Sequence, residues 1–111
     1  MKLNIITLFF FSFCIGQNAE LFDKGNDLYN QGRYLEAIES YDDIIKDGKH
    51  SSELYYNMGN SYYKLNDIAN SIFYYEKALL LNPKNEKITN NLSFAQNMLI
   101  DKIEPLSKNQ I

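Results

Sequence analysis

A 34-residue period constrains this chain more than any other feature of its sequence. Shifting the sequence by 34 positions superimposes identical residues: Gly25 on Gly59, Asn26 on Asn60, Tyr29 on Tyr63, Ile38 on Ile72 and Tyr41 on Tyr75. A second shift pairs Leu54 with Ile88, Asn57 with Asn91 and Met58 with Leu92. A fixed period of this length is the signature of stacked supersecondary units. The sequence therefore predicts two full units, at about 18–51 and 52–85, and part of a third.

Each unit has the pattern of two helices joined by a turn. In the second unit the apolar residues recur at helical spacing in two stripes: Tyr55, Met58, Gly59 and Tyr62, then Ile68, Ile72, Tyr75, Ala78 and Leu79. Turns are expected at 31–33 and 65–67, where Gly32 and Asn66 favour them. Asn82 and Pro83 should end the second pair, since proline cannot continue a helix. Ser51 or Ser52 is the expected cap of the helix that begins the second unit.

The third unit has only one helix, expected over about 86–102. Its apolar face is Ile88, Leu92, Ala95, Leu99 and Ile103. A terminal unit of a stacked array needs a polar outer face, so this helix is interpreted as a cap, followed by a flexible tail at 104–111. The fold class predicted is all-α, with about five antiparallel helices.

Two glycines lie inside the predicted helices at the same place in each unit. Glycine costs about 1 kcal/mol relative to alanine in a helix interior, so Gly25 and Gly59 need a reason. The expectation is that the backbone of the next helix passes too close to leave room for a Cβ.

The second unit resembles the tetratricopeptide repeat, whose pattern is W-x2-L-G-x2-Y, then A-x3-F, then P. The matching residues are Tyr55, Met58, Gly59, Tyr62, Ser71, Tyr75, Ala78 and Pro83. The first unit keeps Gly25, Ala37 and Tyr41 but has Lys24, Leu28 and Lys49 where the family prefers Leu, Tyr and Pro. The resemblance covers about residues 18–100 and implies a right-handed superhelix.

In that family the first helix of each repeat lines a concave, partner-binding groove. The groove residues implied are Asn26, Tyr29, Asn30, Tyr56, Asn57, Asn60, Tyr63, Lys64, Lys87 and Asn91, with Phe22, Asn90 and Phe94 also facing inward. Asparagine offers both donors and acceptors to a peptide backbone, and tyrosine is enriched at interfaces. A known carboxylate clamp of the family is treated as absent, because Phe22 and Asn91 replace two of its basic residues.

Residues 1–16 have the pattern of a secretory signal peptide. Lys2 is followed by a mostly apolar stretch, and Cys14 and Gly16 place small residues before a cut expected at Gln17. The alternative is a buried N-terminal helix, which would show polar residues on one face. Cys14, the only cysteine, could carry a lipid anchor, but Phe13 stands where such a site needs a small residue. Without Cys14 the exported chain has no thiol chemistry.

Composition and single residues argue against several other functions. The chain is 45% hydrophobic and 23% charged, as folded proteins are, and its net charge is −3 with no run of basic residues, which argues against nucleic acid. His50 is the only histidine and lies in a predicted loop; Asp42 and Asp43 lie on an exposed helix face. No phosphate-binding glycine motif is present. The sequence predicts no enzyme, no metal and no cofactor.

Three segments together resemble the BatE-type repeat proteins of bacterial aerotolerance operons. They are Ala19-Glu20-Leu21-Phe22, the stretch from Leu54 to Asn60, and the stretch from Asp101 to Leu106. The resemblance implies a scaffold in the periplasm or cell envelope whose partner is a von Willebrand factor A-domain membrane protein. Membrane association would come through that partner or through a missing C-terminal region. Two alternatives stay open: an assembly or transport factor for exported clients, and a truncated remnant of a longer membrane-anchored protein.

Overall fold

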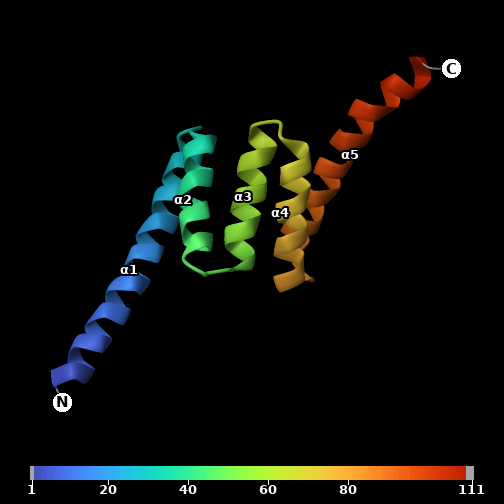
Figure 1. Ribbon diagram of the computed structural model, residues 1–111. Coiled ribbons are helices and arrows are strands. Elements are labelled where there is room, and N and C mark those ends of the chain that lie inside the picture. Colours follow the sequence, from blue (N-terminus) through green and yellow to red (C-terminus); the bar gives the residue numbers. More distant parts are fainter. Residues whose placement is uncertain (1, 110–111) are drawn as a thin grey trace.

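The computed structural model describes residues 2–109, and within them every regular element is a helix. The five helices are α1 (Lys2–Asn30), α2 (Tyr34–Lys46), α3 (Ser52–Lys64), α4 (Ile68–Leu81) and α5 (Glu86–Asn109) (Figure 1). The all-α class predicted from the sequence is therefore confirmed. The pairing of α1 with α2 and of α3 with α4, followed by a single α5, also agrees with the 34-residue period.

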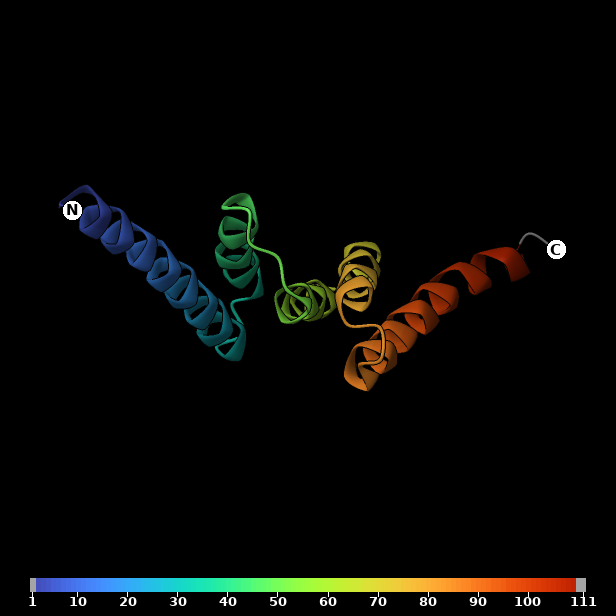
Figure 2. The ribbon, with the colours of Figure 1, turned by 90° about the horizontal axis from the view of Figure 1, so that it is seen from below.

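The helices form two layers. Each helix packs on the next along the chain, and α3 also contacts both α1 and α5. Figure 2 looks along α2, α3 and α4 and shows α1, α3 and α5 on one side of the row, with α2 and α4 on the other. The first helices of the three units therefore line one face of the molecule.

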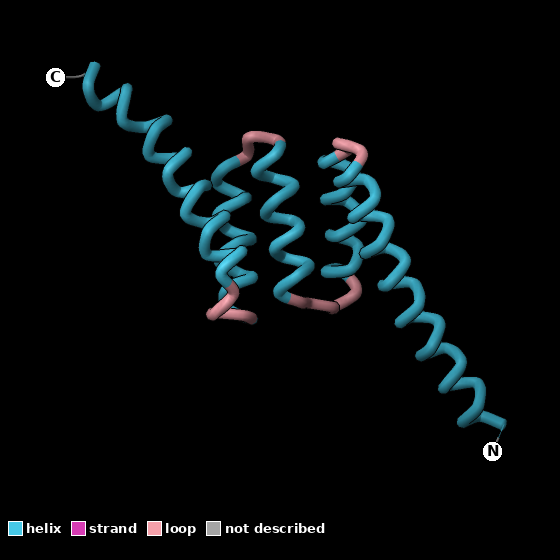
Figure 3. Tube along the Cα trace, turned by 180° about the vertical axis from the view of Figure 1, so that it is seen from behind, coloured by secondary structure: helices cyan, strands magenta, loops and turns pink. Residues whose placement is uncertain are grey.

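Short connections at alternating ends join the helices (Figure 3). Ser51 caps α3 by accepting a hydrogen bond from the Leu54 amide at 3.0 Å, and Asp67 caps α4 by accepting one from the Asn70 amide at 3.3 Å. Gly32 and Asn66 have positive φ angles of 78° and 62° in the two turns within the units. The expected turns and the end of α4 before Pro83 are thus confirmed.

The core lies between the layers and is built from equivalent positions of each unit. Ala37 and Ala78 are completely buried, as are the rings of Tyr41 and Tyr75. The rest of the core consists mainly of aliphatic side chains from all five helices: Leu28, Ile38, Ile44, Leu54, Met58, Ile68, Ile88, Leu92 and Ala95. Tyr62 is only half-buried and stacks on Tyr74 with ring centroids 5.4 Å apart.

The reason for the two glycines differs from the one predicted. A Cβ on Gly25 would lie 2.8 Å from Cδ1 of Tyr41, and one on Gly59 would lie 2.6 Å from Cε1 of Tyr75. The close neighbour in each unit is therefore an aromatic ring and not the backbone of the next helix. Sequence spacing indicated the crowding but could not distinguish a ring from a main chain.

The outer face of α5 is polar where a further helix of a longer array would pack. The residues 34 positions after Tyr55, Gly59 and Tyr62 are Thr89, Ser93 and Gln96, and all three are exposed. The inner stripe is buried only as far as Ala95, because α5 then runs past the end of the bundle (Figure 1). Leu99 is 36% exposed and Ile103 55% exposed, so the apolar stripe is longer than the surface that covers it.

The two ends of the chain extend the terminal helices. Residues 2–16, assigned to a signal peptide, form the first half of α1 and project from the bundle (Figure 1). Residues 104–109 of the predicted tail have helical backbone in α5, while residues 110 and 111 lie outside the described part. None of the helices, as far as the structure describes them, is long and apolar enough to span a bilayer.

Candidate functional site

The face formed by α1, α3 and α5 carries three adjoining hollows. The Lys64 hollow, of about 320 Å³, is lined by Tyr29, Tyr56, Asn60, Tyr63, Lys64, Tyr75, Asn91 and Phe94. The Asn26 hollow, of about 330 Å³, is lined by Asn26, Tyr29, Asn30, Tyr41, Asn57 and Asn60. The Lys87 hollow, of about 410 Å³, is lined by Ser52, Glu53, Tyr56, Asn57, Asn82, Asn85, Lys87 and Ile88. The hollows share lining residues and therefore adjoin one another, and together they are called the groove.

The groove contains all ten residues that the sequence placed in it. Each lines at least one hollow. Phe94 also lines the Lys64 hollow, whereas Phe22 packs on the Tyr41 ring, with centroids 6.0 Å apart, and lines none of the three. Asn90, also expected to face inward, is exposed and lines none of the three hollows. Sequence reasoning missed Ser52, Glu53 and Asn85, at or next to the starts of α3 and α5, and Asn82, which follows α4. The only signal for the first three was that they immediately precede or begin helices already assigned to the groove.

On the groove side of the first unit, one asparagine oxygen accepts two hydrogen bonds, and this arrangement is called a bracket. The Tyr41 hydroxyl donates to Asn26 Oδ1 at 2.6 Å, and Asn57 Nδ2 donates to the same oxygen at 3.0 Å. Tyr41 comes from α2, so its phenol passes between the layers to reach the groove floor. Asn26 is thereby fixed by one partner from its own unit and one from the next.

The second unit repeats this bracket one period later. The Tyr75 hydroxyl donates to Asn60 Oδ1 at 2.5 Å, and Asn91 Nδ2 donates to the same oxygen at 3.0 Å. Asn91 Nδ2 also donates to the Tyr56 hydroxyl at 3.0 Å. We call these two arrangements the asparagine–tyrosine brackets. They join α1 to α3 and α3 to α5, so four of the groove asparagines also hold the solenoid together.

Tyr41 and Tyr75, which reach the brackets from α2 and α4, titrate far above neutral pH. Burial, helped by repulsion from a charged Tyr29, raises the pKa of Tyr41 from 10.0 to about 12. Burial also raises the pKa of Tyr75. Both hydroxyls therefore remain protonated donors at physiological pH, which the geometry of the brackets requires.

This shift predicts a loss of stability in alkali. The unfolded chain releases the Tyr41 proton near pH 10 and the folded chain only near 12, so the Tyr41 contribution to the free energy of unfolding should be fully present below pH 9 and be lost between pH 10 and 12. Urea denaturation at pH 7, 10 and 11.5 measures it. Tyr41→Phe should flatten the dependence relative to a Tyr63→Phe control. Equal slopes in the two variants would contradict the role of Tyr41.

The opposite face carries an aromatic cluster. His50 hydrogen-bonds the Tyr55 hydroxyl and stacks on its ring, and Lys77 Nζ lies 5.2 Å from the centre of the Tyr55 ring. His50 is therefore an exposed loop residue with a structural partner. Asp42 pairs with Lys46 at 3.2 Å, as an exposed helix pair does. Over the described residues, no three His, Cys, Asp or Glu side chains gather as a metal site.

Comparison with known families agrees with this geometry. The family model described as the tetratricopeptide repeat matches residues 52–85. This stretch is a tetratricopeptide repeat. It runs from the first residue of α3 to the residue before α5, so it contains the glycine, the buried tyrosine and the first half of the second bracket. Tetratricopeptide repeats are typically protein-interaction modules, because stacked repeats create extended concave binding surfaces. No curated protein matches the chain.

Proposed function

We propose that the protein is an exported scaffold whose tetratricopeptide groove binds an extended peptide or a helix of a partner protein in the cell envelope. The observation that carries this proposal is the groove of three adjoining hollows on α1, α3 and α5, lined mainly by tyrosine and asparagine. Tyrosine gives large contact area with a polar tip, and the brackets hold the groove rigid before a ligand arrives.

Export is proposed from the signal-type pattern of residues 1–16 in the sequence. Residues 2–16 project from the body (Figure 1), and the cut expected before Gln17 lies one residue ahead of Asn18, whose side chain bonds Asp47 just after the end of α2. That bond joins Asn18 Nδ2 to Asp47 Oδ2 at 3.0 Å. Removal of residues 1–16 would therefore leave the packed part of α1 in place.

The partner we propose is a von Willebrand factor A-domain membrane protein of an aerotolerance-type complex. The basis is the resemblance of three segments to BatE-type proteins, one of which, Leu54 to Asn60, lies on α3 and includes three groove residues. Residues that recognise the same kind of partner are expected on a helix that lines the groove, and this segment lies on such a helix.

Charge reversal in the groove should weaken this association. Lys64 and Lys87 are exposed and line two different hollows, so Lys64→Glu with Lys87→Glu should lower recovery of the partner from envelope extracts about tenfold. Co-purification followed by mass spectrometry measures the recovery. The control is Lys46→Glu with Lys49→Glu, which changes the net charge equally on residues that line none of the three hollows.

Two outcomes would count against the proposal. Recovery of an A-domain protein that is the same for the groove and control variants would show that the groove is not the binding surface. Weak recovery of many unrelated exported proteins would favour an assembly or transport factor over a dedicated scaffold.

A further inference from the structure

The hydrogen bonds of the second bracket determine what the Lys64 hollow can still offer a ligand. Asn60 Oδ1 already accepts two hydrogen bonds, one from the Tyr75 hydroxyl and one from Asn91 Nδ2. A carbonyl oxygen has two lone pairs, so this acceptor is saturated and only the Nδ2 donors of Asn60 remain for a ligand.

The other polar groups of the hollow add mostly donors. The Tyr56 hydroxyl accepts from Asn91, which leaves its own hydrogen available. The hydroxyls of Tyr29 and Tyr63 can donate, and Lys64 offers only donors. The acceptors that remain are Oδ1 of Asn91 and the oxygens of the tyrosine hydroxyls, which donate as well as accept. The free amide hydrogens of Asn60 and the ammonium group of Lys64 give the hollow more donors than acceptors, because the bracket has used Oδ1 of Asn60.

The charge of the hollow differs from that of the chain. The protein has a net charge of −3, yet none of the eight residues that line this hollow, all in the described range, carries a carboxylate. Lys64 is exposed, and neither of the two ion pairs found among the described residues involves it. Phe94, which is 60% exposed, gives the hollow an apolar wall.

We infer that the Lys64 hollow binds the carboxylate of an acidic side chain within the partner peptide, flanked by an aromatic residue that packs on Phe94. A carboxylate supplies only acceptors, which matches the donors of Asn60, Tyr56 and Lys64. The inference rests on the proposed function, since it names the ligand chemistry of the same groove. It differs from the clamp discussed above, because its cation is at the end of α3.

A side chain within the peptide fits better than a chain terminus. The Lys64 hollow shares Tyr29 and Asn60 with the Asn26 hollow and Tyr56 with the Lys87 hollow. A peptide that enters it can therefore continue into either neighbour, whose asparagines can bond its backbone amides. A peptide that ends in the Lys64 hollow could continue into only one of the two neighbouring hollows and would leave the other empty.

The test uses two acetylated and amidated peptides, Ser-Gly-Phe-Glu-Gly-Ser and the same peptide with Gln in place of Glu. Binding to ¹⁵N-labelled full-length protein is followed by NMR, with the side-chain amide of Asn60 as the local readout. The Glu peptide should bind about fivefold more tightly than the Gln peptide and shift that amide, as an exposed ion pair allows. Lys64→Gln should abolish the difference.

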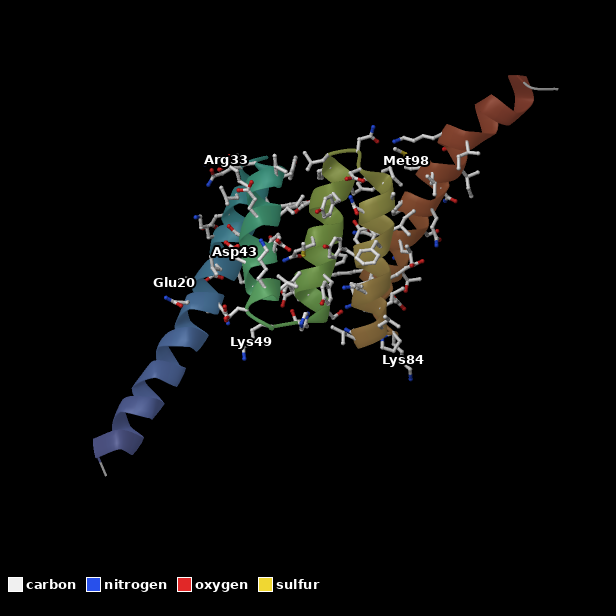
Figure 4. All side chains as sticks on the ribbon, viewed as in Figure 1. Glu20, Arg33, Asp43, Lys49, Lys84 and Met98 are labelled. Atoms are coloured by element: carbon white, nitrogen blue, oxygen red, sulfur yellow. The ribbon has the colours of Figure 1, made fainter. Side chains whose placement is uncertain are left out.

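A matched control and the remaining peptides separate the possible failures. Lys84→Gln removes the same charge at the opposite end of the bundle, where Figure 4 shows Lys84, and should leave the fivefold preference unchanged. A third peptide with a free C-terminal carboxylate and no Glu should bind no better than the Gln peptide; tighter binding would overturn the choice of a side chain.

Equal binding of the Glu and Gln peptides in the groove would overturn the inference while leaving the proposed peptide scaffold intact. No binding by either peptide would also overturn it. The proposed function fails separately, if the groove variants of the co-purification experiment recover the partner as well as the control does.

Discussion

Replacing Gly59 by alanine should lower the free energy of unfolding by about 2 kcal/mol, although alanine favours a helical backbone by about 1 kcal/mol. The added Cβ would stand 2.6 Å from Cε1 of Tyr75, and that ring has little room to move. It is 1% exposed, and its hydroxyl is bonded to Asn60 at 2.5 Å. Ser71 also ties the two helices together, because its hydroxyl donates to the Gly59 carbonyl at 2.9 Å.

Thermal and urea denaturation measure this effect, with an expected fall in Tm of roughly 10 °C. Gly25→Ala should behave similarly, because Tyr41 occupies the equivalent place. Ser93→Ala is the matched control: Ser93 lies one period after Gly59, is exposed, and should change stability by less than about 0.5 kcal/mol. In a Tyr75→Leu background the cost of Gly59→Ala should shrink. Stabilisation by Gly59→Ala in the unaltered chain would refute the close packing.

The sequence was sufficient to predict most of the fold, because repeat architecture is written in local signals. Glycine and asparagine in the turns, the Ser51 cap and the proline after α4 each act within a few residues, and the period repeats them. The lengths of the terminal helices do not follow from these local signals. A helix can continue beyond its packed face, so burial on α5 ends near Ala95 while the helix does not.

The groove was predicted by residue but not by bonding. The period places Asn26 and Asn60 on one face, and this is enough to expect them in a groove. Nothing in the period shows that Tyr41 and Tyr75, from the other layer, reach the same oxygens. Those bonds join residues 15 and 31 positions apart and depend on the distance between layers. The expectation that every groove asparagine is fully available to a peptide therefore overestimates the number of free hydrogen-bond acceptors in the groove.

Asn60→Ala should lower the free energy of unfolding by about 2 kcal/mol, a cost that arises inside the protein and not from any ligand. The substitution removes the acceptor of two donors at once, the Tyr75 hydroxyl and the Asn91 amide. Because Tyr75 is only 1% exposed, its hydroxyl would lose its protein partner, and an unsatisfied buried donor costs about 1–3 kcal/mol.

A double-mutant cycle with Tyr75→Phe, measured by urea denaturation, isolates the bracket. Tyr75→Phe alone should cost about 1 kcal/mol, and the double variant should cost less than the sum of the two single variants, because phenylalanine leaves no hydroxyl to satisfy. Asn90→Ala, on the exposed side of α5 next to Asn91, is the control and should be nearly neutral. Additive costs would show that Asn60 and Tyr75 stabilise the protein independently. If the costs are coupled, weaker partner binding by an Asn60 variant would reflect a destabilised groove and not a lost contact with the ligand. Lys64 is exposed and outside both brackets, so it is the residue whose substitution tests recognition.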